Sequence, residues 1–429
     1  LRSGHEQAAI ELPRGFVSGL IGVDYTADQV VEALRLIGCD IQDAGTDAAA
    51  PWLVFPPSWR PDLTDRWTLA EEVARIHGLD QVPSVLPTPP SGRGLTSAQR
   101  ARRRVSNALA AAGYVETPSF PFATVESNDL HGSADGGHLP SIKLANPLDG
   151  QLPFLRRSLV PGLLQVAHRN VSRGLVDLAL FETGVVFLPA AGVEYGTPFV
   201  PPLGVRPDAA TLAGLDASIP SQPRRVAVLL TGARVAKQPG QGAEAADLAD
   251  VIDAVRTVAS AAGVDVTIVQ TRRAALHPGR AGDVRVGDVT VGYVGELLPA
   301  VAADADLPGR VIVAELDLDL MISLAGERVV AASLSGFPAA TQDVSLVVSE
   351  AVPAAEVEAA LVSGAGDLLE AVRLVDDYRG PGVDPGTKSL TYALRFRAPD
   401  RTLTAAEATE AKLAGVAAAA ERFGARIRE

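Results

Sequence analysis

Apolar and polar positions along the chain predict a mixture of helices and strands. Apolar residues recur at helical spacing over residues 27–38, with Gly38 placed to end that helix, and again over residues 98–112. Alternating positions further along predict strands at Val226–Leu230, Val264–Val269, Val289–Gly295 and Val311–Leu316. Such a mixture suits an antiparallel sheet flanked by helices, so the middle of the chain is predicted to be α+β.

The last part of the chain follows the order strand, helix, strand, strand, helix, strand. These elements are Val344–Val348, Pro353–Val362, Val372–Tyr378, Leu390–Phe396, Ala405–Phe423 and Ala425–Ile427. Their order is the split βαβ arrangement of ferredoxin-like folds. Residues 382–389 contain Gly and Lys but run into a strand, whereas a phosphate-binding loop must open a helix. We therefore predict a hairpin loop there.

Passages rich in Pro and Gly mark the boundaries between domains. Residues 83–94 are predicted to be a linker, and residues 201–225 a surface insertion within one larger domain. A further boundary is expected near Leu334. The chain is thus predicted to be a multidomain α+β protein with domains at residues 1–90, 95–332 and 335–429.

Composition narrows the class of protein. At 429 residues and 47% hydrophobic, the chain suits roughly two to four globular domains. It has no apolar run of roughly 20 residues and no signal peptide, so no membrane span is expected. Its only cysteine, Cys39, fits a reducing cytoplasm and a core position. The net charge of −13 argues against bulk electrostatic binding of nucleic acid, so RNA contacts would need local basic patches.

Paired carboxylates lie in a predicted helix near the start of the chain. Thr68 and Glu71 have the spacing of a capping box, so the helix is predicted to begin at Thr68. Glu72 borders its apolar face, and Glu71 points away with Arg75 one turn on. From the residues alone, these groups form a cap, an ion pair and a solvated edge.

Three groups of residues occur in order along the chain. The first joins Pro57-Ser58-Trp59-Arg60-Pro61-Asp62 to Glu71-Glu72-Val73-Ala74-Arg75-Ile76. The second comprises Asn146-Pro147-Leu148, Leu155-Arg156-Arg157-Ser158-Leu159, Phe181-Glu182-Thr183-Gly184 and His277-Pro278-Gly279-Arg280-Ala281. The third contains Phe337-Pro338-Ala339, Lys388-Ser389-Leu390 and Asp400-Arg401-Thr402-Leu403-Thr404. In this order, over nearly the whole chain, they resemble the beta subunit family of bacterial phenylalanyl-tRNA synthetases.

The resemblance implies a small helical domain, a class II synthetase-like antiparallel-sheet core and a C-terminal ferredoxin-fold anticodon-binding domain. A class II active site needs a Gly-rich strand and helix ending in an ATP-binding arginine, because the phosphate charges must be neutralised. Residues 292–330 contain no such element. The core is therefore predicted to have a catalytic fold without catalytic residues.

The resemblance also implies a magnesium site formed by Asp62, Glu71 and Glu72, since hard cations prefer carboxylate oxygens. Thr68 occupies a position where the family has a further aspartate. Both residue types cap helices well, but threonine removes one anionic ligand. Asp65 could reach in from the preceding turn.

Candidate RNA contacts lie in the last domain. Arg395, Arg397 and Arg401 form a local basic strip opposed only by Asp400, and Tyr378 offers a stacking surface for an unpaired base. Where the family usually has an arginine, this chain has Gln342. In the core, three further arginines could cap helices and meet solvent, or could face a partner subunit or tRNA: Arg156, Arg157 and Arg169.

The resemblance implies the beta subunit of a phenylalanine–tRNA ligase. With a catalytic alpha subunit in an (αβ)2 assembly, it would support ATP-dependent attachment of phenylalanine to tRNA(Phe) in the cytoplasm, away from membranes. The chain has no initiator methionine, and its one methionine is Met321, so we expect a longer parent. The family's N-terminal tRNA-binding and editing domains are not expected in this part. The alternatives are a non-catalytic regulatory paralogue and a free-standing RNA-binding protein; the C-terminal domain argues against the first.

Overall fold

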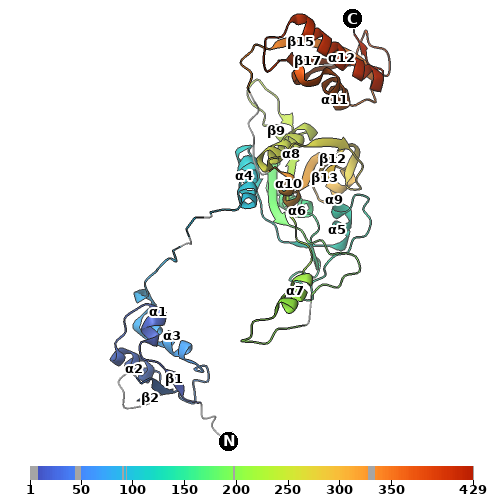
Figure 1. Ribbon diagram of the computed structural model, residues 1–429. Helices are drawn as coiled ribbons and strands as arrows, with labels where there is room; N and C mark the ends of the chain where they lie inside the picture. The colour runs from blue at the N-terminus through green and yellow to red at the C-terminus, as the bar shows by residue number, and fades with distance from the viewer. Residues whose placement is uncertain are drawn as a thin grey trace. The chain divides into compact units, whose positions relative to one another are not determined.

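The computed structural model describes residues 8–43, 50–88, 91–92, 94–196, 199–326 and 334–428. The chain divides into two compact units between Thr96 and Ser97, at the end of the passage rich in Pro and Gly (Figure 1). Across the described ranges, no helix is both long and apolar enough to cross a membrane.

The first unit combines helices with a small sheet. Its elements are β1 (Ile10–Leu12), α1 (Phe16–Ile21), α2 (Ala27–Leu36), β2 (Asp40–Asp43), β3 (Trp52–Phe55) and α3 (Arg66–His77), followed by a short 3-10 turn at Leu79–Gln81. The strands form an antiparallel sheet in the order β1-β3-β2, which the sequence analysis did not predict. Cys39 is buried among the apolar side chains of this unit, which confirms its predicted core position.

Helix α3 begins two residues earlier than predicted, at Arg66. Asp65 is the N-cap, and its Oδ1 accepts hydrogen bonds from the amides of Trp67 and Thr68, at 3.0 and 2.9 Å. The Thr68 hydroxyl donates to the same oxygen. The predicted capping box at Thr68 was therefore wrong, because an ionised aspartate at the true N-cap satisfies the free amides first.

The central region contains a seven-stranded sheet in the order β11-β12-β13-β14-β8-β7-β4. All neighbours are antiparallel except β4 and β7. Its strands are β4 (Val115–Glu116), β7 (Leu178–Val185), β8 (Arg224–Thr231), β11 (Thr267–Gln270), β12 (Leu276–Val286), β13 (Val289–Leu297) and β14 (Val311–Asp317). The strands predicted at 226–230, 264–269, 289–295 and 311–316 lie within or across β8, β11, β13 and β14, which confirms the α+β class.

Helices cover both faces of this sheet. On one face, Val226, Val228 and Leu230 of β8 pack with α4 (Ser97–Ala111), α8 (Leu248–Ala262) and α10 (Leu318–Leu324). On the other face, Ala227 and Leu229 pack with α6 (Val160–Val171) and α9 (Pro299–Asp304). The remaining elements are the helices α5 (Val125–Gly132) and α7 (Ala209–Ala217), and the short strands β5 (Phe122–Ala123), β6 (Phe154–Leu155), β9 (Ala233–Val235) and β10 (Glu244–Ala245).

The C-terminal domain has the predicted ferredoxin-like order. Its elements are β15 (Ala340–Ser349), α11 (Ala354–Ala365), β16 (Leu369–Tyr378), β17 (Thr387–Phe396), α12 (Ala405–Phe423) and β18 (Arg426–Ile427), with a 3-10 turn at Gly366–Leu368. The strands pair antiparallel in the order β16-β17-β15-β18. Residues 379–386 link β16 to β17, which confirms a hairpin loop there, although residues 387–389 of the predicted loop already belong to β17. Phe396 is fully buried, so it packs in the core.

Helices α11 and α12 cross at two glycines. A Cβ added to Gly364 would lie 2.7 Å from the backbone oxygen of Ala414, and one added to Gly415 would lie 2.8 Å from that of Leu361. Both distances are shorter than a real contact allows, so the crossing requires glycine at both positions.

Candidate functional site

The carboxylates predicted to bind magnesium are held by arginines. Arg60 donates from Nε to Asp62 Oδ1 at 3.0 Å and from Nη2 to Asp62 Oδ2 at 2.6 Å. The same Nη2 lies 3.0 Å from Glu72 Oε1, and Arg75 Nη2 lies 2.6 Å from Glu72 Oε2. Arg75 thus pairs with Glu72 and not with Glu71, which is exposed. Both oxygens of Asp62 and both of Glu72 already accept from a guanidinium.

These contacts keep the carboxylates ionised. The hydrogen bond from Arg60 lowers the pKa of Asp62. The hydrogen bond from Arg75 lowers the pKa of Glu72, although burial of that side chain opposes the shift. Asp65 serves the helix N-terminus, and the amide of Thr68 is the largest cause of its lowered pKa.

The predicted cation ligands do not form a cation site as they stand. Among the described residues, no group of three or more His, Cys, Asp or Glu side chains could hold a metal ion. Asp62 and Glu72 face Arg60, and Thr68 donates its hydroxyl proton to Asp65 and so adds no anionic oxygen. No chemical role is therefore assigned to a metal ion at this position.

A buried ion pair lies on the sheet face covered by α6. Arg156 Nη1 donates to Glu182 Oε1 at 2.7 Å and to Ser119 Oγ at 3.0 Å, and Arg156 Nε donates to the carbonyl of Val185. Arg156 and Glu182 are only 6% and 3% exposed. A Cβ on Gly184 would lie 2.4 Å from Arg156 Nη2, so this glycine makes room for the guanidinium. Both predicted alternatives were therefore wrong for Arg156, which neither meets solvent nor faces a partner or tRNA.

Glu315 is the centre of a second buried network on the same face. Its carboxylate accepts from Ser158 Oγ at 2.8 Å, from the amide of Leu159 at 2.8 Å and from the Tyr293 hydroxyl at 3.1 Å. Arg225 Nη1 lies 3.4 Å from Glu315 Oε1. Burial, followed by the nearby Glu315 charge, raises the pKa of Tyr293. The hydroxyl is therefore a permanent donor to Glu315.

Charges on this sheet face are thus matched within the chain. Arg273 stacks over the Tyr293 ring at 4.3 Å and pairs with Asp283 at 3.3 Å. His131 is buried nearby, and burial lowers its pKa to about 4, so the ring is neutral at neutral pH. Buried cations that are already paired offer little neutralisation to an incoming phosphate.

Residues of this network were missed as a site by the sequence analysis. Glu315 lies inside the apolar strand β14, and Tyr293 lies inside the apolar strand β13. A charge within such a run was the available signal, since a carboxylate is rarely buried without a partner. Its partners Ser158 and Arg225 are distant in sequence, so the pattern gave no means of finding them.

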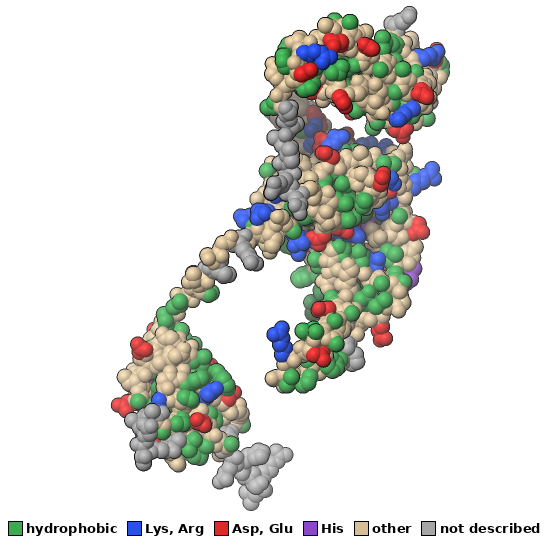
Figure 2. Space-filling view, in the orientation of Figure 1, with side chains coloured by type: hydrophobic (Ala, Val, Ile, Leu, Met, Phe, Trp, Pro, Cys, Tyr) green, Lys and Arg blue, Asp and Glu red, His purple; other side chains and the backbone are tan. Residues whose placement is uncertain are grey.

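In the C-terminal domain, the predicted basic strip is more neutralised than expected. Arg395 and Arg397 share Glu370, with Nε to carboxylate distances of 2.5 and 2.8 Å. Arg401 pairs with Asp400 at 3.2 Å and Glu407 at 2.8 Å. The expectation of Asp400 as the only opposing charge was therefore wrong. Figure 2 shows acidic and basic side chains interspersed on the visible face of this domain.

Two of these arginines nevertheless remain accessible, whereas Arg397 is only 16% exposed and also donates to the carbonyl of Phe337. The side chains of Arg395 and Arg401 are 52% and 53% exposed, and strand alternation places Arg395 and Arg397 on one face, as predicted. Tyr378 donates to the carbonyl of Pro381 at 3.1 Å, and Arg428 lies over its ring at 4.8 Å. Gln342 donates to Thr409 of α12 at 2.9 Å, so it lies on the helix-covered side.

Three family models match the chain in succession. The B5 domain of tRNA synthetases matches residues 10–79, the CLM domain of the phenylalanyl tRNA synthetase beta chain matches residues 82–318, and the ferredoxin-fold anticodon-binding domain matches residues 335–428. The second model alone covers more than half of the chain.

The curated relatives cited below share one name, phenylalanine–tRNA ligase beta subunit. The phenylalanine–tRNA ligase beta subunit of Leifsonia xyli subsp. xyli is 55% identical over 98% of this chain and 49% of its own length. The subunit so named from Streptomyces avermitilis is 46% identical over 98% of this chain and 50% of its own length. The chain therefore spans about half the length of the curated relatives it matches.

A solved pyrrolysyl-tRNA synthetase from Desulfitobacterium hafniense is 14% identical over 70% of this chain and 89% of its own, with a TM-score of 0.37. A structural similarity this low supports no conclusion about this chain. The family assignment rests instead on the order of the three domains and on the relatives across the whole chain. On these grounds, the chain belongs to the phenylalanyl-tRNA synthetase beta chain family.

Proposed function

We propose that the chain is the C-terminal portion of a phenylalanine–tRNA ligase beta subunit. In this role it binds tRNA(Phe) and a catalytic alpha subunit in a cytoplasmic (αβ)2 assembly. The alpha subunit performs the ATP-dependent activation of phenylalanine and its transfer to tRNA. The observation that carries the proposal is the succession of three family domains over nearly the whole chain.

The buried networks of the central sheet support a non-catalytic role for this chain. Arg156 and Arg225 are engaged by Glu182 and Glu315. Reaching a triphosphate would leave those carboxylates buried without partners, which is costly. The central domain is therefore proposed to act as a scaffold for the partner subunit.

Magnesium and ATP belong to the proposed reaction of the complex. Asp62, Glu71 and Glu72 are proposed as magnesium ligands of this chain on the condition that the ion displaces Arg60 from Asp62 and Glu72, because the three side chains do not form a cation site as they stand. Arg395, Arg397, Arg401 and Tyr378 remain the proposed tRNA contacts.

Pyrophosphate exchange dependent on phenylalanine and ATP tests the proposal. The chain alone should give no exchange, and adding the cognate alpha subunit should give a complex isolated by size-exclusion chromatography that exchanges pyrophosphate. Exchange by the chain alone would contradict the non-catalytic role. Failure of the two chains to associate would contradict the subunit role.

A further inference from the structure

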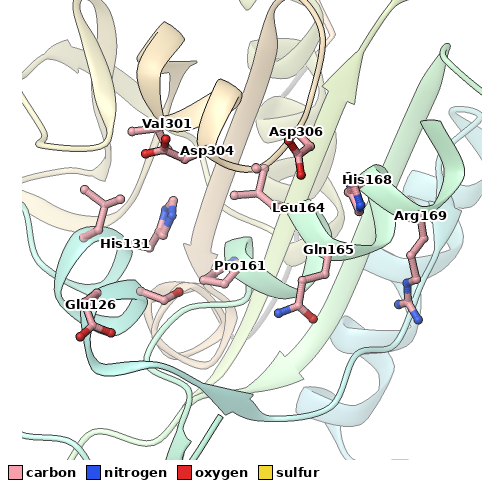
Figure 3. A pocket seen from close by; sticks show the side chains of 13 residues that line it. Glu126, His131, Pro161, Leu164, Gln165, His168, Arg169, Val301, Asp304 and Asp306 are labelled. Atoms are coloured by element: carbon pink, nitrogen blue, oxygen red, sulfur yellow. The ribbon is translucent and has the colours of Figure 1, made fainter. Parts of the chain in front are cut away.

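The central domain carries a pocket that the proposed function does not use. It has a volume of about 640 Å³ and lies among residues of α5, α6 and α9 and the turn that follows α9 (Figure 3). Sites for small molecules usually have volumes of roughly 300–1,000 Å³ and mostly apolar walls. Here the apolar wall is formed by Leu130, Pro161, Leu164, Val301 and Ala305.

Charged groups of both signs surround this apolar wall. Three carboxylates and one guanidinium line the pocket and are exposed, and no ion pair of theirs is present in the described part of the chain: Glu126, Asp304, Asp306 and Arg169. His131 also lines it but adds no charge at neutral pH, because burial lowers its pKa to about 4. Free charges of both signs beside an apolar wall suit a ligand that carries both charges and an apolar group.

The carboxylate of Asp306 lies on a backbone of unusual conformation. Asp306 has φ +54°, and among the described residues it is the only one with positive φ that is not glycine. Such a conformation is uncommon outside glycine but is tolerated best by Asp and Asn. In Figure 3, His168 and Arg169 lie toward one end of the pocket, Asp306 and Leu164 lie nearer its middle, and Val301 lies toward the other end.

From these features, we propose that the pocket binds an apolar α-amino acid as a zwitterion. The ligand ammonium pairs with Asp306, its carboxylate pairs with Arg169, and its side chain packs on Leu130, Leu164 and Val301. Asp306 and Arg169 are taken as the two charged partners because both line this pocket, beside its apolar wall. This site is independent of the proposed function, because it needs neither ATP, tRNA nor an alpha subunit.

Three probes of similar size separate the contributions of the two charges. L-Phenylalanine carries both charges, 2-phenylethylamine only the ammonium, and 3-phenylpropanoate only the carboxylate. Binding to the purified 429-residue chain is followed by saturation-transfer NMR and titration calorimetry. L-Phenylalanine should bind with the lowest Kd, and each single-charge probe should bind about threefold to tenfold more weakly, as expected for loss of one partly solvated charge pair.

Two variants assign the charges to their partners. Arg169→Gln should weaken L-phenylalanine and 3-phenylpropanoate by about threefold to tenfold and leave 2-phenylethylamine unchanged. Asp306→Asn should weaken L-phenylalanine and 2-phenylethylamine and leave 3-phenylpropanoate unchanged; asparagine tolerates the same backbone conformation, so the turn is kept. Arg173→Gln, just beyond α6 and outside the pocket, is the matched control and should change no Kd.

Several results would overturn the inference. One is the absence of L-phenylalanine binding at millimolar concentration. Another is binding that neither variant changes, which would place the ligand elsewhere. A third is 2-phenylethylamine binding as tightly as L-phenylalanine, which would indicate a site for cations and not for zwitterions. Unchanged circular dichroism spectra of both variants would establish that the chain still folds, and these outcomes then bear on the pocket alone.

Discussion

The central sheet and the β16–β17 hairpin of the C-terminal domain each contain an Arg–Glu ion pair. The first pair is buried, and the second is exposed to solvent. Arg156 and Glu182 are almost wholly buried; both hydrogen-bond to Ser119, and Arg156 also donates to the Val185 carbonyl. Arg395 and Glu370 are 52% and 39% exposed. Buried partners cannot be exchanged for water, whereas exposed ones can. The first pair therefore serves the fold, and the second can be given up to a ligand such as a phosphate.

Replacing the glutamate of each pair by glutamine should give the largest difference between the two regions. Glu182→Gln leaves the Arg156 guanidinium buried without its anion, which should lower the free energy of unfolding by about 3–5 kcal/mol. Glu370→Gln should lower it by less than about 1 kcal/mol. Urea denaturation followed by circular dichroism measures both.

A double variant is the control for this experiment. Arg156→Met combined with Glu182→Gln removes both charges, so it should recover part of the stability lost in Glu182→Gln alone. Equal losses for Glu182→Gln and Glu370→Gln would contradict the distinction between the two regions.

The next largest effect concerns the buried His131. Its pKa is about 4 in the folded chain and 6.5 in the unfolded reference, so the unfolded chain takes up the proton first as the pH falls. Stability should therefore be lost between about pH 6.5 and pH 4, by at most about 3 kcal/mol. His131→Leu should flatten this part of the pH dependence relative to the original chain. A pH profile that is identical in both would show that His131 does not cause the loss.

A smaller effect is expected for RNA binding by Arg395 and Arg397. Arg395→Ala with Arg397→Ala should weaken tRNA binding and lower the log–log salt slope by roughly one unit or somewhat more, since up to two phosphate contacts are removed. Glu370→Gln should strengthen tRNA binding, because Glu370 no longer competes with phosphate for the two guanidinium groups. Fluorescence anisotropy at several salt concentrations measures both. If neither variant changes the affinity or the slope, RNA does not bind on this face.

The smallest effect is expected at the N-terminal carboxylates. Thr68→Asp should bind magnesium more tightly than the original chain, because affinity rises with the charge of the ligands. The difference is expected to be modest, since Arg60 and Arg75 already neutralise Glu72. Titration calorimetry on both chains decides it. Equal affinities would place Thr68 outside the coordination sphere.

The predictable parts of the fold were those set by local patterns. The order of elements in residues 340–427 follows from alternation and helical spacing, and α12 has the predicted bounds of 405–423. The start of α3 was mispredicted because Thr68 and Asp65 are both good caps, and the sequence does not show which of them meets the free amides.

Side-chain partners across the sheet could not be predicted. Arg156 contacts Glu182, and Ser158 contacts Glu315. Both contacts form only because the fold brings together residues that are distant in the sequence. Glu370 was missed as the partner of Arg395 and Arg397 because it lies on a different strand and 27 residues before Arg397. Spacing along the chain carries no information about such contacts.

The two glycines at the crossing of α11 and α12 have a mechanical consequence. Because the helix backbones touch there, neither helix can move by one turn along the other without a steric clash. The sheet of this domain therefore rests on a stiff support, and its open face, which carries Arg395 and Arg397, keeps its shape. A ligand bound to that face would have to adapt its own conformation to the domain.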